Sequence, residues 1–177
     1  MKKRLIILSD IWGKDKSEWI INYTQYLEAN FDIKYYDCCE LGRIDKSDYT
    51  ENRLHKQFVN GGIERAVERL LEIEKHSLNI LAFSIGGTVA WKFGIQSNKI
   101  NSLTCVSSTR LRNETIRPKG EIMLFYGADD AFKHQREWLN NMRVKYSIVN
   151  GKEHQFYIEP EFAQQLCEQV IENINKR

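Results

Sequence analysis

The chain of 177 residues contains 42% hydrophobic and 28% charged residues, and its formal net charge is +2 at pH 7. This length suits one domain with a sizeable core, so we predict a single domain over residues 1–177. The nearly balanced charge gives no reason to expect nucleic acid or a membrane as a partner, which leaves a small molecule as the expected ligand.

The N-terminal residues and the cysteines indicate a cytoplasmic protein. The apolar run at 5–8 stops at Ser9 and Asp10, too early for the hydrophobic part of a signal peptide, and no transmembrane stretch follows. Cys38 and Cys39 are adjacent, and the two other cysteines fall in predicted core elements. We therefore expect reduced, structural cysteines, no metal site and no cofactor.

Hydrophobic patterns along the chain predict strands that alternate with helices. In chain order the predicted elements are a strand at 5–8, a helix capped by Ser17, a strand at 33–36, a polar loop at 40–60, a helix opened by Gly61 and Gly62, a strand at 78–83, a helix after Ser84, strands at 103–106 and 121–126, a helix around 138–142, a strand at 144–149 and a helix from 161. This alternation predicts an α/β fold: a doubly wound, mostly parallel six-stranded sheet with helices on both faces.

Polar or otherwise distinctive residues follow several of these strands directly. They are Asp10, Trp12, Ser84, Asp130 and His154. Because the carboxyl ends of parallel strands meet at one edge of the sheet, these side chains are expected close together. The sequence therefore predicts a functional site at that edge.

Ser84 lies at the joint between a buried strand and a helix. At such a joint the serine is presented at the positive end of the helix, where backbone N–H groups can stabilise an oxyanion. A tight turn of this kind leaves no space for long side chains two positions on either side of the serine. Ala82 and Gly86 are the small residues that it requires.

A serine hydroxyl becomes an effective nucleophile only when a base lies within hydrogen-bond reach and an acceptor holds that base. Asp130 follows the fifth predicted strand and His154 follows the sixth, so both can meet Ser84. Asp129 is the alternative acid, since either aspartate could cap the next helix while the other faces the site. The remaining histidines lack a strand-end context and are expected at the surface: His55, His76 and His134.

Three short motifs resemble those of the α/β-hydrolases. The string A-F-S-I-G at 82–86 resembles the nucleophile elbow G-x-S-x-G, with alanine in place of the first glycine. The string G-x-x-H-x-F at 151–156 and the string D-x-W-G at 10–13 resemble the histidine loop and the first-strand turn of dienelactone hydrolases and small carboxylesterases. The chain order of serine, acid and histidine is also that of the family.

The resemblance implies further parts of the site. The backbone N–H of Ile85, together with that of either Trp12 or Ile11, would form the oxyanion hole. The lid insertion common in the family is almost absent here. The basic loop at 107–119 is the only candidate for one.

The resemblance implies a hydrolase with Ser84 as nucleophile, whereas dienelactone hydrolases use a cysteine. We therefore expect a serine hydrolase that cleaves a carboxylic ester or thioester of a small acyl substrate through an acyl-enzyme intermediate. One alternative is an acyl-carrier thioesterase or acyltransferase with the same triad. Another is a non-catalytic descendant that binds a small molecule or a protein, an alternative that Ala82 keeps open.

Overall fold

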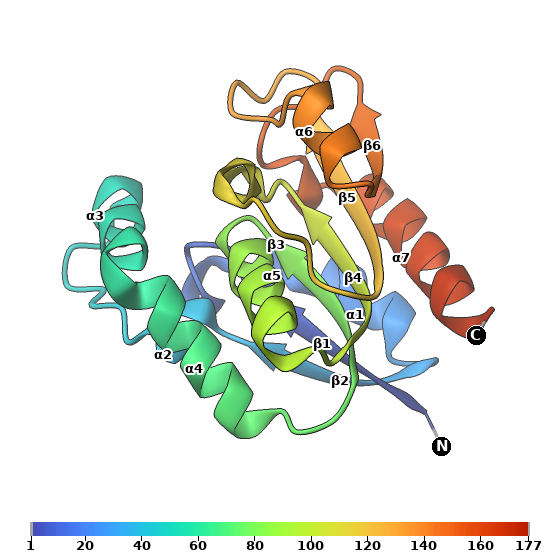
Figure 1. Ribbon diagram of the computed structural model, residues 1–177, viewed down its shortest axis with the longest axis horizontal. Helices are drawn as coiled ribbons and strands as arrows, with labels where there is room; N and C mark the ends of the chain where they lie inside the picture. Colours follow the sequence, from blue (N-terminus) through green and yellow to red (C-terminus); the bar gives the residue numbers. More distant parts are fainter. Residues whose placement is uncertain (1, 177) are drawn as a thin grey trace.

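Six parallel strands form one sheet in the computed structural model, which describes residues 2–176 (Figure 1). The strand order is β2-β1-β3-β4-β5-β6, and every neighbouring pair is parallel. In chain order the strands are β1 (Lys3–Leu8), β2 (Phe31–Tyr36), β3 (Leu78–Phe83), β4 (Ile100–Val106), β5 (Glu121–Gly127) and β6 (Lys145–Val149). The predicted α/β fold with a six-stranded parallel sheet is confirmed.

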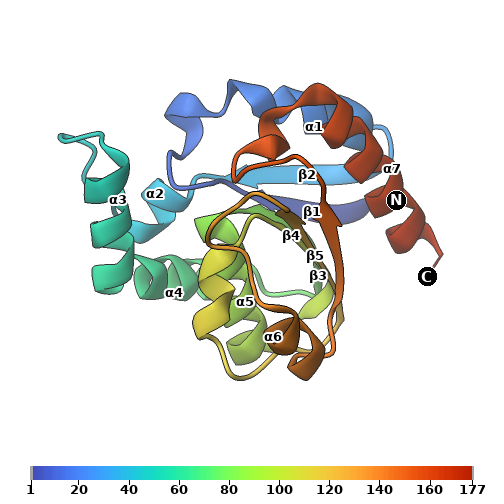
Figure 2. The same cartoon turned by 90° about the horizontal axis from the view of Figure 1, so that it is seen from above.

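Helices cover both faces of this sheet (Figure 2). One face carries α1 (Ile21–Leu27) and α7 (Pro160–Asn175). The other face carries α2 (Cys38–Gly42), α4 (Ile63–Ile73), α5 (Ile85–Ser97) and α6 (Arg136–Asn141). The sheet is therefore doubly wound, as predicted.

Each face of the sheet has its own hydrophobic core, because side chains alternate along a strand. In β1, Leu5 and Ile7 pack with α1 and α7, whereas Ile6 and Leu8 belong to the core beneath α4 and α5. Every residue of β3 is buried, which explains why its sequence is apolar almost throughout.

The strand order reverses between β1 and β3. The chain leaves β1 towards β2 on one side, and it leaves β3 towards β4 on the other. The loops that follow β1 and β3 therefore diverge at the carboxyl ends of two adjacent strands, the position where open α/β sheets form a crevice.

The prediction of a loop at 40–60 is wrong, because most of this segment is helical. It contains the end of α2, then α3 (Glu51–Gln57) and a π-helical turn at Phe58–Gly62. Asp37 caps α2 by accepting hydrogen bonds from the N–H groups of Cys39 and Glu40. In α3 and the turn after it, Leu54 and Phe58 are buried four residues apart, but the many polar side chains around them hide this helical pattern.

The expected helix start at Ser17 is also different. Two 3₁₀ turns, Lys14–Lys16 and Glu18–Ile20, precede α1, and Ser17 caps neither with its side chain. Its hydroxyl instead donates to the carbonyl of Lys14 and accepts from Tyr35. Ser17 therefore connects the turns to β2.

The four cysteines are free and buried, as the sequence suggested. Burial raises the pKa of the Cys105 and Cys167 thiols to about 12, so both stay protonated at neutral pH. Among the helices within residues 2–176, none has the length and apolar character that crossing a membrane requires.

Gly86 in α5 allows this helix to approach the end of β1. A Cβ atom at this position would lie 2.4 Å from the carbonyl oxygen of Ser9 and 2.9 Å from that of Leu8. Both obstacles are main-chain atoms, which cannot rotate away. The close packing of α5 on β1 therefore requires a glycine here.

We predict that Gly86→Ala lowers the free energy of unfolding by about 1–3 kcal/mol, the usual cost of forcing extra volume into a packed interior. Urea unfolding of the purified variant measures this loss. Gln96→Ala, at an exposed position of the same helix, is the control and should change stability by no more than about 0.5 kcal/mol. Equal stability of the two variants would contradict the packing argument.

Candidate active site

Helix α3 and the loops after β1, β3, β4, β5 and β6 surround a pocket of about 1060 Å³ at the carboxyl edge of the sheet. Its lining residues come from the first-strand loop (Ile11, Trp12), α3 (Glu51, Asn52, His55), the elbow (Ser84, Ile85), the loop after β4 (Thr109, Arg110, Arg112), the loop after β5 (Asp129, Phe132) and residues 151–159. Ser84 and His154 both line it, so the pocket reaches the residues that the sequence singled out.

Ser84 occupies a strained turn between β3 and α5. Its φ is 48° and its ψ is −115°, a conformation that costs a non-glycine residue about 1–3 kcal/mol. Its N–H donates to the carbonyl of Val106 on the neighbouring strand, which helps to hold the turn. Ala82, two residues earlier, is fully buried. The local geometry is that of the strand-turn-helix elbow expected from the sequence.

Ser84, His154 and Asp130 form a continuous hydrogen-bonded series. The Oγ atom of Ser84 lies 3.1 Å from Nε2 of His154, and Nδ1 of the same ring lies 2.7 Å from Oδ2 of Asp130. The structure therefore brings together three residues from the ends of three strands, within the distances that proton transfer requires.

Asp130 is buried, with 3% of its surface exposed, yet it is suited to remain ionised. Burial favours the neutral acid, but hydrogen bonds from His154 and from the N–H of Phe132 outweigh this effect and lower the pKa of Asp130 below its usual value. A carboxylate in this position keeps a proton on Nδ1 of His154, which leaves Nε2 free to accept one from Ser84.

The rival residue Asp129 does not touch His154. Its side chain is exposed on the wall of the pocket, and its N–H donates to the carbonyl of Lys152. Of the two candidates, Asp130 alone has the position of the histidine partner.

Gly127 allows the loop after β5, which carries Asp130 (the acid loop), to approach the loop after β6, which carries His154 (the histidine loop). A Cβ atom at Gly127 would lie 2.1 Å from the carbonyl oxygen of Lys152 and 2.6 Å from that of Glu153. The loops are also joined by a hydrogen bond from the N–H of Ala128 to the carbonyl of Val149. Ser107 holds the other side of the histidine loop, because its hydroxyl donates to the carbonyl of His154 at 2.6 Å.

The two alternatives for the second oxyanion donor differ in their hydrogen bonds. The N–H of Trp12 already donates to Oδ1 of Asp10 at 2.9 Å. Within residues 2–176, no acceptor is found for the N–H of Ile11 or for that of Ile85, the first residue of α5. Ile11 and Ile85, which line the pocket together with Ser84, therefore have the N–H groups that remain available among the three candidates.

The basic loop at 107–119 contributes only part of its charge to the pocket. It contains a 3₁₀ turn at Thr109–Asn113, and Arg110 and Arg112 from this turn line the pocket. Arg117 points elsewhere and donates to the carbonyls of Gly120 and Arg143. The loop therefore forms part of the pocket wall through Thr109, Arg110 and Arg112.

Two histidines have surroundings that the sequence did not reveal. His55 is exposed, as expected, but it lies on the pocket wall, where partial desolvation and the charge of Arg110 lower its pKa. His134 is buried with 4% exposure, so its expected surface position is wrong. Its ring packs against Tyr126 and Trp138, with centroid distances of 4.6 and 4.2 Å, and His134 lies two residues before α6, so no helical spacing in the sequence signals these contacts.

No protein-family model and no curated protein matches the sequence. Solved structures do resemble it. A protein from Xanthomonas campestris assigned to the α/β-hydrolase superfamily is 14% identical, with 99% of this chain and 100% of that chain covered and a TM-score of 0.69. Est1E from Butyrivibrio proteoclasticus, with ferulic acid bound, is 10% identical, with 99% and 89% covered and a TM-score of 0.68.

A protein from Klebsiella pneumoniae assigned as a dienelactone hydrolase is also similar. It is 13% identical, with 98% of this chain and 85% of that chain covered and a TM-score of 0.69. The chain therefore has the α/β-hydrolase fold over nearly its whole length. The fold expected from the three sequence motifs is confirmed.

We predict that His134 makes the stability of the protein depend on pH. Burial lowers the pKa of His134 to about 4, whereas the unfolded side chain titrates near 6.5. Between these two pH values His134 binds a proton in the unfolded chain and not in the folded chain. This residue therefore destabilises the fold progressively as the pH falls from about 6.5 to 4. The loss by pH 4 should reach about 3 kcal/mol.

Urea unfolding of wild type and His134→Phe between pH 4 and 7.5 measures this loss. The variant keeps an aromatic ring between Tyr126 and Trp138 and should gain stability relative to wild type as the pH falls. His76→Phe, at an exposed position, provides the matched control and should follow the wild-type curve. Parallel curves for wild type and His134→Phe would show that His134 titrates normally.

Proposed function

We propose that this protein is a serine hydrolase that cleaves a carboxylic ester or thioester of a small substrate through an acyl-enzyme intermediate. The observation that carries the proposal is the series Ser84, His154 and Asp130, with contacts of 3.1 and 2.7 Å, opening into the pocket. The likeness to Est1E, a structure with a carboxylic acid bound, supports an acyl substrate.

In the proposed reaction, Oγ of Ser84 attacks the carbonyl carbon while Nε2 of His154 removes its proton. Asp130 holds Nδ1–H and stabilises the imidazolium that forms. The carbonyl oxygen becomes an oxyanion, which accepts hydrogen bonds from the N–H groups of Ile11 and Ile85. His154 then protonates the leaving alcohol or thiol, and the acyl group remains on Ser84.

Hydrolysis of the acyl-enzyme repeats these steps with water. His154 takes a proton from the attacking water, and the second tetrahedral intermediate collapses with return of that proton to Ser84. The same residues thus serve twice, first to form the acyl-enzyme and then to release the acid.

The strain at Ser84 favours this enzyme over a binding protein that has lost catalysis. Binding a ligand does not require a serine with a φ of 48°. A nucleophile does require this sharp turn, because the turn presents the serine hydroxyl to the substrate. Transfer of the acyl group to another acceptor, or action on an acyl carrier, would use the same three residues. A panel of esters and thioesters with and without competing acceptors separates these activities.

We predict that wild type reacts with a fluorophosphonate probe at Ser84 and hydrolyses short acyl esters. Ser84→Ala should lose both properties, with kcat lowered by about 10⁴-fold or more, because the nucleophile is absent. Its thermal midpoint should stay within a few degrees of wild type, which shows that the fold is intact. Retention of a tenth of the activity in Ser84→Ala would assign the reaction to another group.

We predict different effects for the two neighbouring aspartates. Asp130→Asn should lower kcat by about 10³–10⁴-fold, because an amide no longer fixes the tautomer of His154. Asp129→Asn is the matched control and should change kcat by less than about threefold, since its side chain makes no contact with His154. Steady-state kinetics with one ester decides between them, and an exchange of the two effects would make Asp129 the acid.

A further inference from the structure

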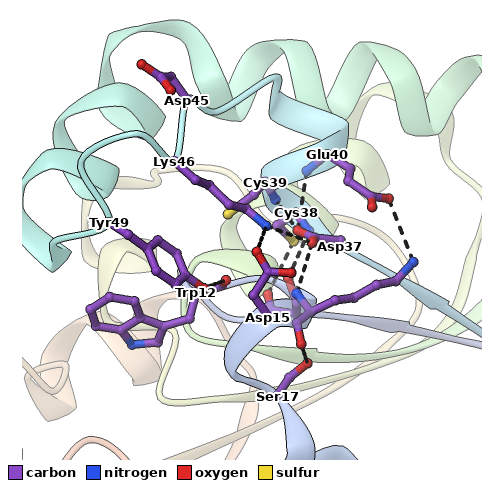
Figure 3. Close-up of polar contacts among 12 residues, drawn as sticks. Trp12, Asp15, Ser17, Asp37, Cys38, Cys39, Glu40, Asp45, Lys46 and Tyr49 are labelled. Atoms are coloured by element: carbon purple, nitrogen blue, oxygen red, sulfur yellow. Dashed lines mark hydrogen bonds and ion pairs between the residues drawn. The ribbon is translucent and has the colours of Figure 1, made fainter.

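The loop at 9–14 carries Ile11, whose N–H is a proposed oxyanion donor. One side of this loop is held by the segment after β2 (Figure 3). Asp37 accepts a hydrogen bond from the N–H of Lys14 at 2.9 Å, the thiol of Cys39 donates to the carbonyl of Ile11 at 3.2 Å, and Tyr49 donates to the carbonyl of Trp12. These bonds fix the backbone on the C-terminal side of the Ile11 N–H.

Asp10 holds the other side of the same loop. Its side chain is buried, with 2% exposure. Oδ1 accepts from the N–H of Trp12 at 2.9 Å, and the carbonyl of Asp10 accepts from the N–H of Gly13 at 3.3 Å. The carboxylate therefore closes a tight turn around Ile11 and sets the direction of its N–H.

The second carboxylate oxygen of Asp10 reaches a different part of the site. Oδ2 accepts a hydrogen bond from the hydroxyl of Tyr157 at 3.0 Å. Tyr157 lies three residues after His154 and is buried, with 1% exposure. Asp10 thus joins the loop of the oxyanion donor to the loop of the histidine.

Tyr157 also touches the elbow. Its ring packs against Phe83, the residue before Ser84, with a centroid distance of 5.4 Å, and it meets the ring of His154 edge to face at 6.4 Å. Its own carbonyl accepts from the hydroxyl of Tyr23 at 2.6 Å. A side chain anchored in this way can hold Asp10 in one place relative to both Ser84 and His154.

We propose that Asp10 is a positioning residue. Together with Tyr157 it holds the Ile11 N–H in a fixed position relative to Ser84 and His154. This inference rests on the proposed function. Neither side chain contacts the reacting atoms; each acts through the backbone or the ring that it holds. Loss of either side chain should therefore weaken stabilisation of the transition state and leave substrate binding nearly unchanged.

The ionisation of Asp10 provides an independent measure of its role. Burial raises the pKa of Asp10 to about 6, against the lowering effects of the Trp12 N–H, the Tyr157 hydroxyl and the charge of His154. Asp37 adds to the increase, and Tyr35, Cys38, Cys39 and Tyr49 are further titratable groups that interact electrostatically with this carboxylate. Because the folded pKa lies above the unfolded value, ionised Asp10 costs stability, and this cost grows as the pH rises from about 4 to 6.

Asp10→Asn and Tyr157→Phe test the proposal. Each should lower kcat by about tenfold or more and leave KM within about twofold, because a misplaced donor weakens the transition state alone. Affinity for a trifluoromethyl ketone, which forms an oxyanion on the serine, should fall by the same factor as kcat/KM. The double variant should be no worse than the more damaged single variant, since both changes break one connection.

Tyr35→Phe is the matched control, because it removes a nearby tyrosine hydroxyl that bonds Ser17 and not Asp10. It should keep wild-type kcat. Asp10→Asn should also melt several degrees above wild type at pH 8, with a smaller difference at pH 5, because the buried charge is gone. Lower activity in a more stable protein is a result that a purely structural aspartate would not give.

Wild-type kcat in both Asp10→Asn and Tyr157→Phe would overturn the proposal. Losses of kcat that Tyr35→Phe shares, or that accompany a lower melting temperature in all variants, would overturn it as well. The reaction of wild-type Ser84 with the fluorophosphonate probe separates this failure from failure of the proposed function. A labelled wild type with unaffected variants rejects the role of Asp10 and Tyr157 alone.

Discussion

The conformation of one residue, Ser84, is the constraint on which the rest of the site depends. Its positive φ is unfavourable for any residue with a side chain, so the neighbours must hold it in place. The bond from its N–H to Val106, the buried Ala82 and the glycine at position 86 all serve this end. The close approach of α5 to β1 follows from the same turn, and it brings the first-strand loop beside the serine.

The parallel sheet explains how distant residues meet at this turn. Ser84, Asp130 and His154 are separated by 46 and 24 positions, yet each follows the carboxyl end of a strand. The reversal of strand order between β1 and β3 separates the loops at that point and leaves space for a pocket. Hydrogen bonds among the loops, such as that from Ser107 to the carbonyl of His154, then reduce the remaining freedom.

Features encoded by local pattern were predictable from the sequence, and features that depend on remote contacts were not. Two features were predictable in this way: the buried strand at Leu78–Phe83, and the placement of Ser84, Asp130 and His154 after the ends of strands. Helix α3 was missed because its buried residue Leu54, and Phe58 directly after the helix, stand among polar side chains that hide the helical pattern. The burial of His134 was missed because it depends on contact with Tyr126 in β5, eight residues earlier in the chain. No periodicity in the sequence reveals this contact.

The absence of a side chain at Gly127 has a consequence for how this site can change. The loop of Asp130 is held against the loop of His154 by main-chain hydrogen bonds, from the N–H of Ala128 to the carbonyl of Val149 and from the N–H of Asp129 to the carbonyl of Lys152. Side chains on the pocket wall nearby, such as Asp129 and Gln155, take no part in that fixation. Substitutions on the pocket wall can therefore change the surface that lines the pocket and leave the spacing of Asp130 and His154 unchanged.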